Sequence, residues 1–244
     1  VKVSDNLHII GGWSVHSSFW RPAKSTKTTD IYNIKTGAII PGPSLRVPRA
    51  GHTATVLNDG RILVVGGFNI KGQSINTAEI YDPRSNSYKI INSHLKVGRG
   101  YHKAIKTGDG RVVIIGGYED NEQASKLIEI FDPNTNTFSQ SDEQMHFERA
   151  DFQASLLETG HILICGGAKK FKMGNKMGEC DECLDSIEVY DPLTQTSTLL
   201  KAKLTIPMAN FTQTVVSENK ILTIGGHKEA MADELYSIIT ILDM

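Results

Sequence analysis

The chain has little net charge, few cysteines and no long apolar run, and each of these shortages excludes a class of protein. Lys and Arg number 26 against 27 Asp and Glu, so the formal net charge is -1, and neither nucleic acid nor an anionic membrane surface is predicted as a partner. The longest apolar runs, such as 62–65, are far too short to cross a bilayer. Three cysteines among 244 residues make no disulfide framework, which favours a reducing, cytoplasmic location, with secretion left open.

Helical periodicity is missing as well, whereas glycine is plentiful and often doubled. Of the 22 glycines, many form adjacent pairs, at residues 11–12, 66–67, 116–117, 166–167 and 225–226. The steps between successive pairs are 55, 50, 50 and 59 residues. A period near 50 indicates a repeat architecture.

Each glycine pair closes a short apolar, partly β-branched run without helical spacing, which predicts a strand buried on both faces. Four of these runs follow a tight-turn signal such as Asn58-Asp59-Gly60, and another strand precedes that turn. A variable loop after the glycines leads to a third strand. In three repeats an Asp-Pro pair, such as Asp82-Pro83, then predicts the turn into a fourth strand. Each repeat should therefore hold four antiparallel strands, A to D.

Repeats of this kind predict an all-β propeller, in which each repeat is one blade. The paired glycines, the aromatic residue of the following strand (Tyr32, Tyr81, Phe131 and Tyr190) and the period near 50 together resemble the kelch repeat. The sequence from Gly60 to Gly67 is also similar to that of the kelch propeller of galactose oxidase and its bacterial relatives.

We expect one propeller domain over residues 1–244, with repeats at about 1–44, 45–94, 95–144, 145–203 and 204–244. The first repeat is predicted to begin at strand B and the last to stop at strand C. Kelch propellers usually have six or seven blades, so two interpretations stay open. The chain is either a compact five-bladed ring or part of a larger ring, whose open strand edge would favour self-association.

Alternating strand direction places the loops between strands B and C and the loops between D and A at the same end of the repeats. The B–C loops vary most in length, which is typical of a binding surface. The resemblance to kelch adaptors implies that a peptide binds at this end. Arg49, Arg99 and Arg149 recur there at intervals of 50, each just before an A strand. They either grip an acidic peptide or bond loop carbonyls between blades.

Two positions of the repeat differ from blade to blade and are candidate partner contacts. Two residues after each arginine the sequence reads Gly51, Tyr101 and Asp151, with Asn210 aligned in the last repeat, a mixed set that favours a polar or partly basic ligand. Directly after the glycine pairs stand Trp13, Phe68, Tyr118, Ala168 and His227. The aromatic residues among them either pack between blades or anchor a partner. Trp13 and Trp20, in a long loop, are the stronger anchor candidates.

Cys180 and Cys183 form the one spacing typical of a metal ligand pair. Two thiolates are half of a tetrahedral zinc site, and a second pair is needed. A local disulfide, a redox pair and an ordinary polar loop are the alternatives. Cys165 lies inside a predicted strand and should belong to the core.

The regular repeat, the variable loop end and the lack of a compact acid–base constellation predict a non-catalytic module that binds a protein or peptide, with no cofactor. The alternative is a kelch-fold enzyme with its site at the mouth of the channel. Galactose oxidase relatives would need copper held by two His and two Tyr, a set with no plausible match here. A sialic-acid isomerase resemblance would instead use charged residues such as Asp151 and Glu119.

Overall fold

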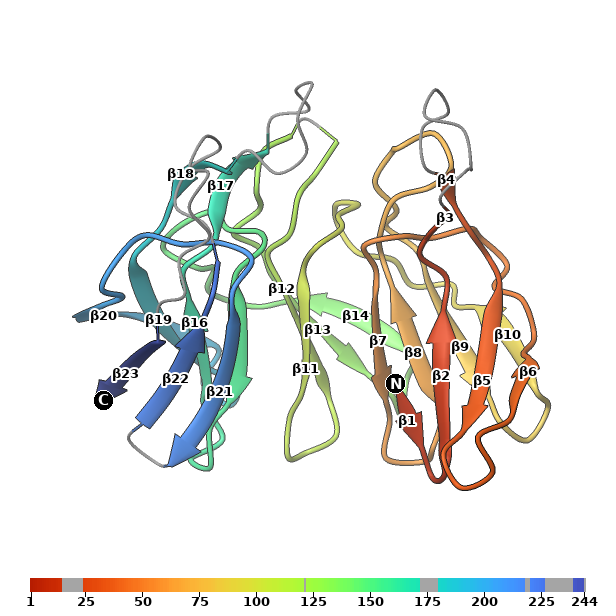
Figure 1. Ribbon diagram of the computed structural model, residues 1–244. Coiled ribbons are helices and arrows are strands. Elements are labelled where there is room, and N and C mark those ends of the chain that lie inside the picture. The colour runs from red at the N-terminus through yellow and green to blue at the C-terminus, as the bar shows by residue number, and fades with distance from the viewer. Residues whose placement is uncertain (15–23, 121, 172–179, 218–219, 227–238, 244) are drawn as a thin grey trace. The chain divides into compact units, whose positions relative to one another are not determined.

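The computed structural model describes residues 1–14, 24–120, 122–171, 180–217, 220–226 and 239–243, and their regular structure is entirely β-sheet (Figure 1). The chain divides into two compact units. One holds residues 1–100 and 132–138, and the other holds residues 101–131 and 139–244. No helix capable of crossing a membrane occurs in the described part of the chain. The predicted all-β class is therefore confirmed.

The first unit contains two complete four-stranded sheets and a small hairpin. Their strands are β1 Lys2–Val3, β2 Asn6–Ile10, β5 Thr29–Asn33 and β6 Ile39–Pro41 in one sheet, β7 Thr53–Val56, β8 Ile62–Val65, β9 Ala78–Asp82 and β10 Ser87–Ile90 in the next, and β3 Trp13–Ser14 with β4 Lys24–Ser25 in the hairpin. All neighbouring strands pair antiparallel.

The strands of the later repeats follow the same order. They are β11 Lys103–Lys106, β12 Val112–Ile115, β13 Ile128–Asp132 and β14 Thr137–Gln140; then β15 Gln153–Leu156, β16 Ile162–Cys165, β19 Ser186–Asp191 and β20 Thr196–Lys203; and last β21 Thr212–Ser217, β22 Lys220–Ile224 and β23 Ile239–Asp243. A separate hairpin, β17 Ala168–Phe171 with β18 Cys180–Cys183, lies in the loop between β16 and β19. Each of these repeats is thus a meander of strands A, B, C and D, the last with three strands among its described residues.

The central strands are buried as their composition predicts. Every residue of β8, β12 and β16 is buried. The turns before them also have the predicted chemistry: Gly60 has φ +86°, and its N–H donates to the Leu57 carbonyl at 3.1 Å. Asp82 accepts the Arg84 N–H at 2.9 Å in the turn after β9.

The glycine pairs join each repeat to the next. Both glycines have positive φ, as at Gly66 (+63°) and Gly67 (+93°), which an L-residue rarely adopts. The second glycine then donates its N–H to a carbonyl that precedes the next A strand, 3.0 Å from Gly67 to Arg99 in the first unit and 2.8 Å from Gly167 to Met208 in the second. This bond links each glycine pair to the segment that carries the repeated arginine, or Met208 in the last repeat.

The structure adds three features that the sequence analysis lacks. The first sheet has a fourth strand, β1, where we predicted the repeat to begin at strand B. Its two residues are too few to show any hydrophobic alternation. The hairpins β3–β4 and β17–β18 lie in two of the variable B–C loops.

Candidate functional site

The loop roots after the glycine pairs are bonded to the segments that precede the A strands. Ala50 and Phe68 exchange two backbone hydrogen bonds, of 3.1 and 2.8 Å, in the first unit. Ala150 and Ala168 do the same in the second unit, both at 2.9 Å. The B–C and D–A loops of a blade therefore share one end, and the β17–β18 hairpin extends from that end of the second unit (Figure 1).

The repeated arginines are part of the scaffold and are closed to a partner. Arg49, Arg99 and Arg149 are completely buried. Arg49 donates from Nε to Glu79 Oε1 at 3.1 Å, and from Nη1 to the carbonyls of Gly66 and Thr77 at 2.9 and 2.8 Å. Arg49 thus bonds loop carbonyls, as one of the two interpretations predicted, but the carbonyls belong to the blade that Arg49 precedes and not to two different blades.

Arg149 has the equivalent bonds in the second unit. It donates from Nη1 to the Gly166 carbonyl at 2.7 Å and from Nη2 to Glu188 Oε1 at 2.5 Å. The other carboxylate oxygen of Glu188 accepts the His146 N–H at 2.7 Å. Sequence analysis recognised the arginines but missed Glu79 and Glu188, although a glutamate recurs in the strands that carry Tyr81 and Tyr190.

The variable position two residues after each arginine has a left-handed backbone, as does the aligned Asn210 of the last repeat. The φ angles are +64° at Gly51, +54° at Tyr101, +52° at Asp151 and +54° at Asn210. A left-handed conformation costs an L-residue roughly 1–2 kcal/mol, least for Gly, Asn and Asp. Tyr101 is the one residue of the four whose type does not suit this conformation, and 38% of its surface is exposed.

Four side chains, that of Asp151 among them, form a cluster in the second unit. The Tyr118 hydroxyl bonds to the Asp151 carboxylate, and the charges of Asp151 and Lys103 interact. The rings of Tyr101 and Tyr118 meet edge to face, with centroids 6.4 Å apart. Asn210 joins the group only through its backbone, because its N–H donates to the Asp151 carbonyl at 2.9 Å. Tyr101, Lys103, Tyr118 and Asp151 are called the Asp151 cluster below.

Lys103 is the member of this cluster that sequence analysis missed. It begins β11 and is paired with Ile115. Thr53, Gln153 and Thr212 begin β7, β15 and β21 with the equivalent pairing, so Lys103 carries the one charge among these four strand starts. That departure from the repeat is visible in the sequence once the A strands are aligned by their partners.

Burial dominates the electrostatics of the cluster. It raises the pKa of Asp151 to about 6, although the Lys103 ammonium and the Tyr118 hydroxyl both lower it. Burial also lowers the pKa of Lys103, against the attraction of Asp151. The pKa of Tyr118 is raised by burial and then by the Asp151 charge. Asp151 is therefore a carboxyl group that changes its charge near neutral pH.

Replacing Asp151 with Asn should stabilise the fold in a pH-dependent way. Between the ordinary value of 3.8 and about 6, the folded chain keeps a proton that the unfolded chain has lost, so wild-type stability falls as the pH rises through this window. The Asn side chain does not ionise, so the variant does not lose stability in this pH window. We expect its free energy of unfolding to exceed that of the wild type by about 1–2 kcal/mol above pH 6, and this difference to shrink towards pH 4, in urea titrations.

Asn210→Asp is the matched control for this prediction, because it exchanges the same two residue types in the same left-handed conformation at an exposed position. Its effect on stability should be small at both ends of the range. If the free energies of unfolding of Asp151→Asn and wild type differ by the same amount from pH 4 to pH 7.5, the pKa of Asp151 is not raised in the folded chain.

The remaining candidates are placed as follows. Trp13 is 41% exposed and pairs with Ser25 in the β3–β4 hairpin, and Phe68 is half-buried beside Gly100. Trp20 and His227 lie outside the described residues.

Cys183 is disulfide-bonded, and the side chain of Cys180 is not among those described. Cys165 is a buried free thiol whose pKa burial raises to about 12, in agreement with its predicted core position. The described residues contain no group of three or more His, Cys, Asp or Glu arranged to hold a metal ion.

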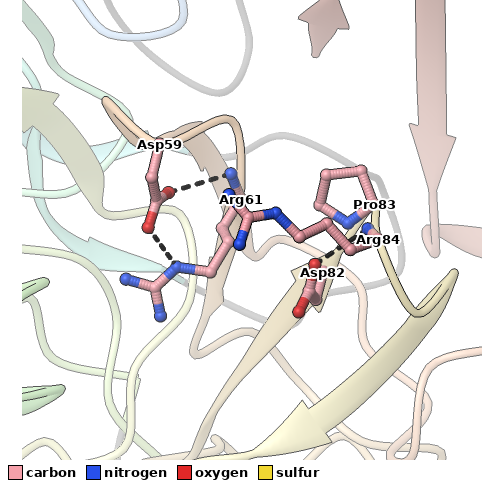
Figure 2. Close-up of a pocket in the computed structure, with 5 residues that line it drawn as sticks. All are labelled: Asp59, Arg61, Asp82, Pro83 and Arg84. Atoms are coloured by element: carbon pink, nitrogen blue, oxygen red, sulfur yellow. Dashed lines mark hydrogen bonds and ion pairs between the residues drawn. The ribbon is translucent and has the colours of Figure 1, made fainter.

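A shallow pocket lies at the other end of the second blade, between the turn after β7 and the turn after β9. Figure 2 shows its lining residues, Asp59, Arg61, Asp82, Pro83 and Arg84. Arg61 donates to Asp59 and also to the Pro133 carbonyl, at 2.9 Å. Its side chain therefore links the turn after β7 to the turn after β13. Arg111 repeats the arrangement in the second unit with Asp109 and the Pro192 carbonyl. A contact that recurs in this way belongs to the scaffold.

Comparison with known proteins identifies the repeat. A family model described as the "KLHDC2/KLHL20/DRC7 Kelch-repeats domain" matches residues 1–229. Among solved structures, one titled "Structure of YjhT" is similar with a TM-score of 0.73 and 16% sequence identity, over 100% of this chain and 82% of that one. At this identity the likeness shows the fold alone. Comparison with curated protein sequences found no match.

Proposed function

Because the chain belongs to the KLHDC2/KLHL20/DRC7 kelch-repeat family and has the kelch β-propeller fold, we propose that it is a non-catalytic module that binds a partner protein or peptide. The partner binds at the end formed by the B–C and D–A loops. Nucleic acid and membranes are not its ligands, since the net charge is -1.

The observation that carries this proposal is the Asp151 cluster. A residue that stabilises the repeated fold is expected at the same position of several repeats, as the buried arginines are. The side chains of Tyr101, Lys103 and Asp151 instead differ from their equivalents, and they meet at one place. Tyr101 is exposed and has the left-handed backbone of this position, which Gly, Asp or Asn adopts at lower cost, and exposed tyrosines are frequent binding hot spots.

Tyr101→Ala should weaken partner binding by about thirtyfold or more, because truncation of an aromatic hot spot typically costs about 2 kcal/mol or more. The partner is first identified by photo-crosslinking from a reactive amino acid placed at Asn210, beside the cluster, and its affinity for each variant is then measured by titration calorimetry. Leu193→Ala is the control, because Leu193 is 81% exposed in the turn between β19 and β20, at the opposite end of the blade that follows the one of Tyr101. Equal affinities for the two variants would remove this end as the binding site.

An enzyme remains the second candidate, and the titrating carboxyl of Asp151 favours it. A general acid or base works best with a pKa near the working pH, and the pKa of Asp151 is raised to about 6. Metal analysis and the ultraviolet–visible spectrum of the purified protein test the copper-radical form of this alternative. Stoichiometric copper with a radical absorption band would replace the binding proposal.

A further inference from the structure

The first sheet leaves one of its two faces exposed. His8 and Ile10 of β2 face the second sheet, where the ring centroids of His8 and Tyr81 are 5.2 Å apart and Ile10 packs against the core. Because side chains alternate along a strand, Leu7 and Ile9 belong to the opposite face. Their exposed fractions are 37% and 50%. Cross-strand pairing adds the other members of this surface, called the outer face below: Asp30, Tyr32, Ile39 and Pro41.

The positions of the outer face are buried in the second sheet. Tyr81 is equivalent to Tyr32 and pairs with Ile62. Tyr32 pairs with Leu7 in the same register. Ile62 and Tyr81 form a core cluster with Leu45, which comes from the segment before strand A. The outer face therefore carries the kind of residues that the repeat buries, but the segment that would cover them is not among the described residues.

Asp30 is the charged member of the outer face, and its equivalent in the second sheet binds a buried arginine. Asp30 aligns with Glu79, since each stands two residues before the tyrosine of its strand. The Glu79 carboxylate accepts the backbone N–H groups of Arg46 and Val47, at 2.7 and 3.0 Å. It also accepts the Nε–H of Arg49 at 3.1 Å. One carboxylate thus holds a loop by its backbone and by its arginine.

The same arrangement recurs in the second unit but is incomplete at Asp30. Glu188 makes the equivalent contacts with His146, Phe147 and Arg149. Asp30 is exposed, and its carboxylate has no hydrogen bond or ion pair among the described residues. The segments held by Glu79 and Glu188 share one pattern, an apolar residue followed four positions later by arginine, at 45–49 and 145–149.

We propose that the outer face binds a short segment of a partner protein in which an apolar residue stands four positions before an arginine. The apolar side chain packs on Leu7, Ile9 and Tyr32, as Leu45 packs on the equivalent residues of the second sheet. The guanidinium donates to the Asp30 carboxylate, and such hydrogen bonds are strong because both groups are ionised.

A partner is the source of this segment, because the chain's own copies are already bound. Arg49, Arg99 and Arg149 are completely buried, and Met208 replaces the arginine in the last repeat. A second copy of the chain could offer such an arginine only by unfolding the loop that contains it. The outer face belongs to the first unit and Asp151 to the second, so this inference goes beyond the proposed function.

The probe is an acetylated and amidated peptide that copies residues 44–51 of the chain. It is titrated into the intact, isotope-labelled chain, and the backbone amide shifts of Ile9 and Tyr32 are followed by NMR. We expect saturable binding that is about tenfold weaker when the peptide carries Arg49→Gln or Leu45→Ala, since each change removes one of the two contacts.

Substitutions in the chain test the same contacts from the other side. Asp30→Asn should weaken binding of the peptide about tenfold and remove its preference for arginine. Asp30→Glu gives the first sheet the carboxylate of the other repeats and should bind the peptide at least as tightly as the wild type. Ile9→Gln should also weaken binding. Its control is Ile70→Gln, because Ile70 is 55% exposed in the loop after β8, away from the outer face.

Three results with the peptide would overturn the inference. They are the absence of a saturable shift, equal binding of the peptide and its Arg49→Gln form, and an arginine preference that survives Asp30→Asn. Sedimentation velocity without peptide gives a fourth test. Self-association that Ile9→Gln abolishes and Ile70→Gln preserves would assign the outer face to a second copy of the chain instead.

Discussion

Glu188→Ala is expected to lower the free energy of unfolding by about 3–5 kcal/mol, because it leaves the buried guanidinium of Arg149 without its counter-charge. Neither side chain is exposed. Glu188 also accepts the backbone N–H groups of His146 and Phe147, at 2.7 and 3.3 Å, so the same substitution releases the loop that leads to β15. Urea unfolding followed by intrinsic fluorescence measures the loss.

Two further variants separate the ion pair from simple removal of a charge. Glu182→Ala removes an exposed carboxylate that pairs with Lys169 and Lys170, and we expect almost no change in stability. Arg149→Met combined with Glu188→Leu replaces both charges by apolar groups and should recover much of the stability lost by Glu188→Ala. A Glu188→Ala protein as stable as the Glu182→Ala protein would show that Arg149 does not depend on its partner.

The ion pair also contributes to the pH dependence of folding. Burial alone would raise the pKa of Glu188, but the Arg149 charge and the hydrogen bonds of His146 hold it below its usual range. A lowered carboxyl pKa gives stability that is present at neutral pH and is lost as the pH falls through the folded value. The raised pKa of Asp151 acts in the opposite direction, so the two carboxylates should be separable by acid titration of their single variants.

The repeat could be predicted from the sequence because its signals are local. Gly60, Gly66 and Gly67 have backbone angles that favour glycine, and each therefore marks a turn or a strand end without reference to the rest of the chain. The two-residue strand β1 could not be predicted in this way, because its pairing with β2 is the one thing that makes it a strand.

The candidate site was predicted in part for the same reason. Tyr101 and Asp151 stood out because they vary at a fixed distance from a repeated arginine. Lys103 and the ion partners Glu79 and Glu188 were missed because their importance comes from contacts between strands far apart in sequence. Arg49 and Arg149 are the opposite case. Their recurrence in the sequence made them candidate partner contacts, but their complete burial shows that they belong to the scaffold.

Gly167→Ala should destabilise the fold by about 3 kcal/mol or more, through backbone strain and overpacking together. Gly167 has φ +99°, and a Cβ atom there would lie 2.7 Å from Phe152 Cβ and 2.8 Å from the Ala150 carbonyl oxygen. Its N–H also bonds to the Met208 carbonyl at 2.8 Å, so the backbone cannot shift without loosening the link to the next blade.

Gly160→Ala is the matched control for Gly167→Ala, because it carries nearly the same strain without the collision. Gly160 has φ +86°, and nothing lies within 4 Å of an added Cβ atom. We expect it to cost only the roughly 1–2 kcal/mol of a left-handed L-residue. The difference between the two variants in urea unfolding therefore measures close packing at the glycine pair. If both variants lose the same stability, glycine is required at position 167 only for its positive φ angle. The close contact with Phe152 and Ala150 would then not be a reason for glycine there.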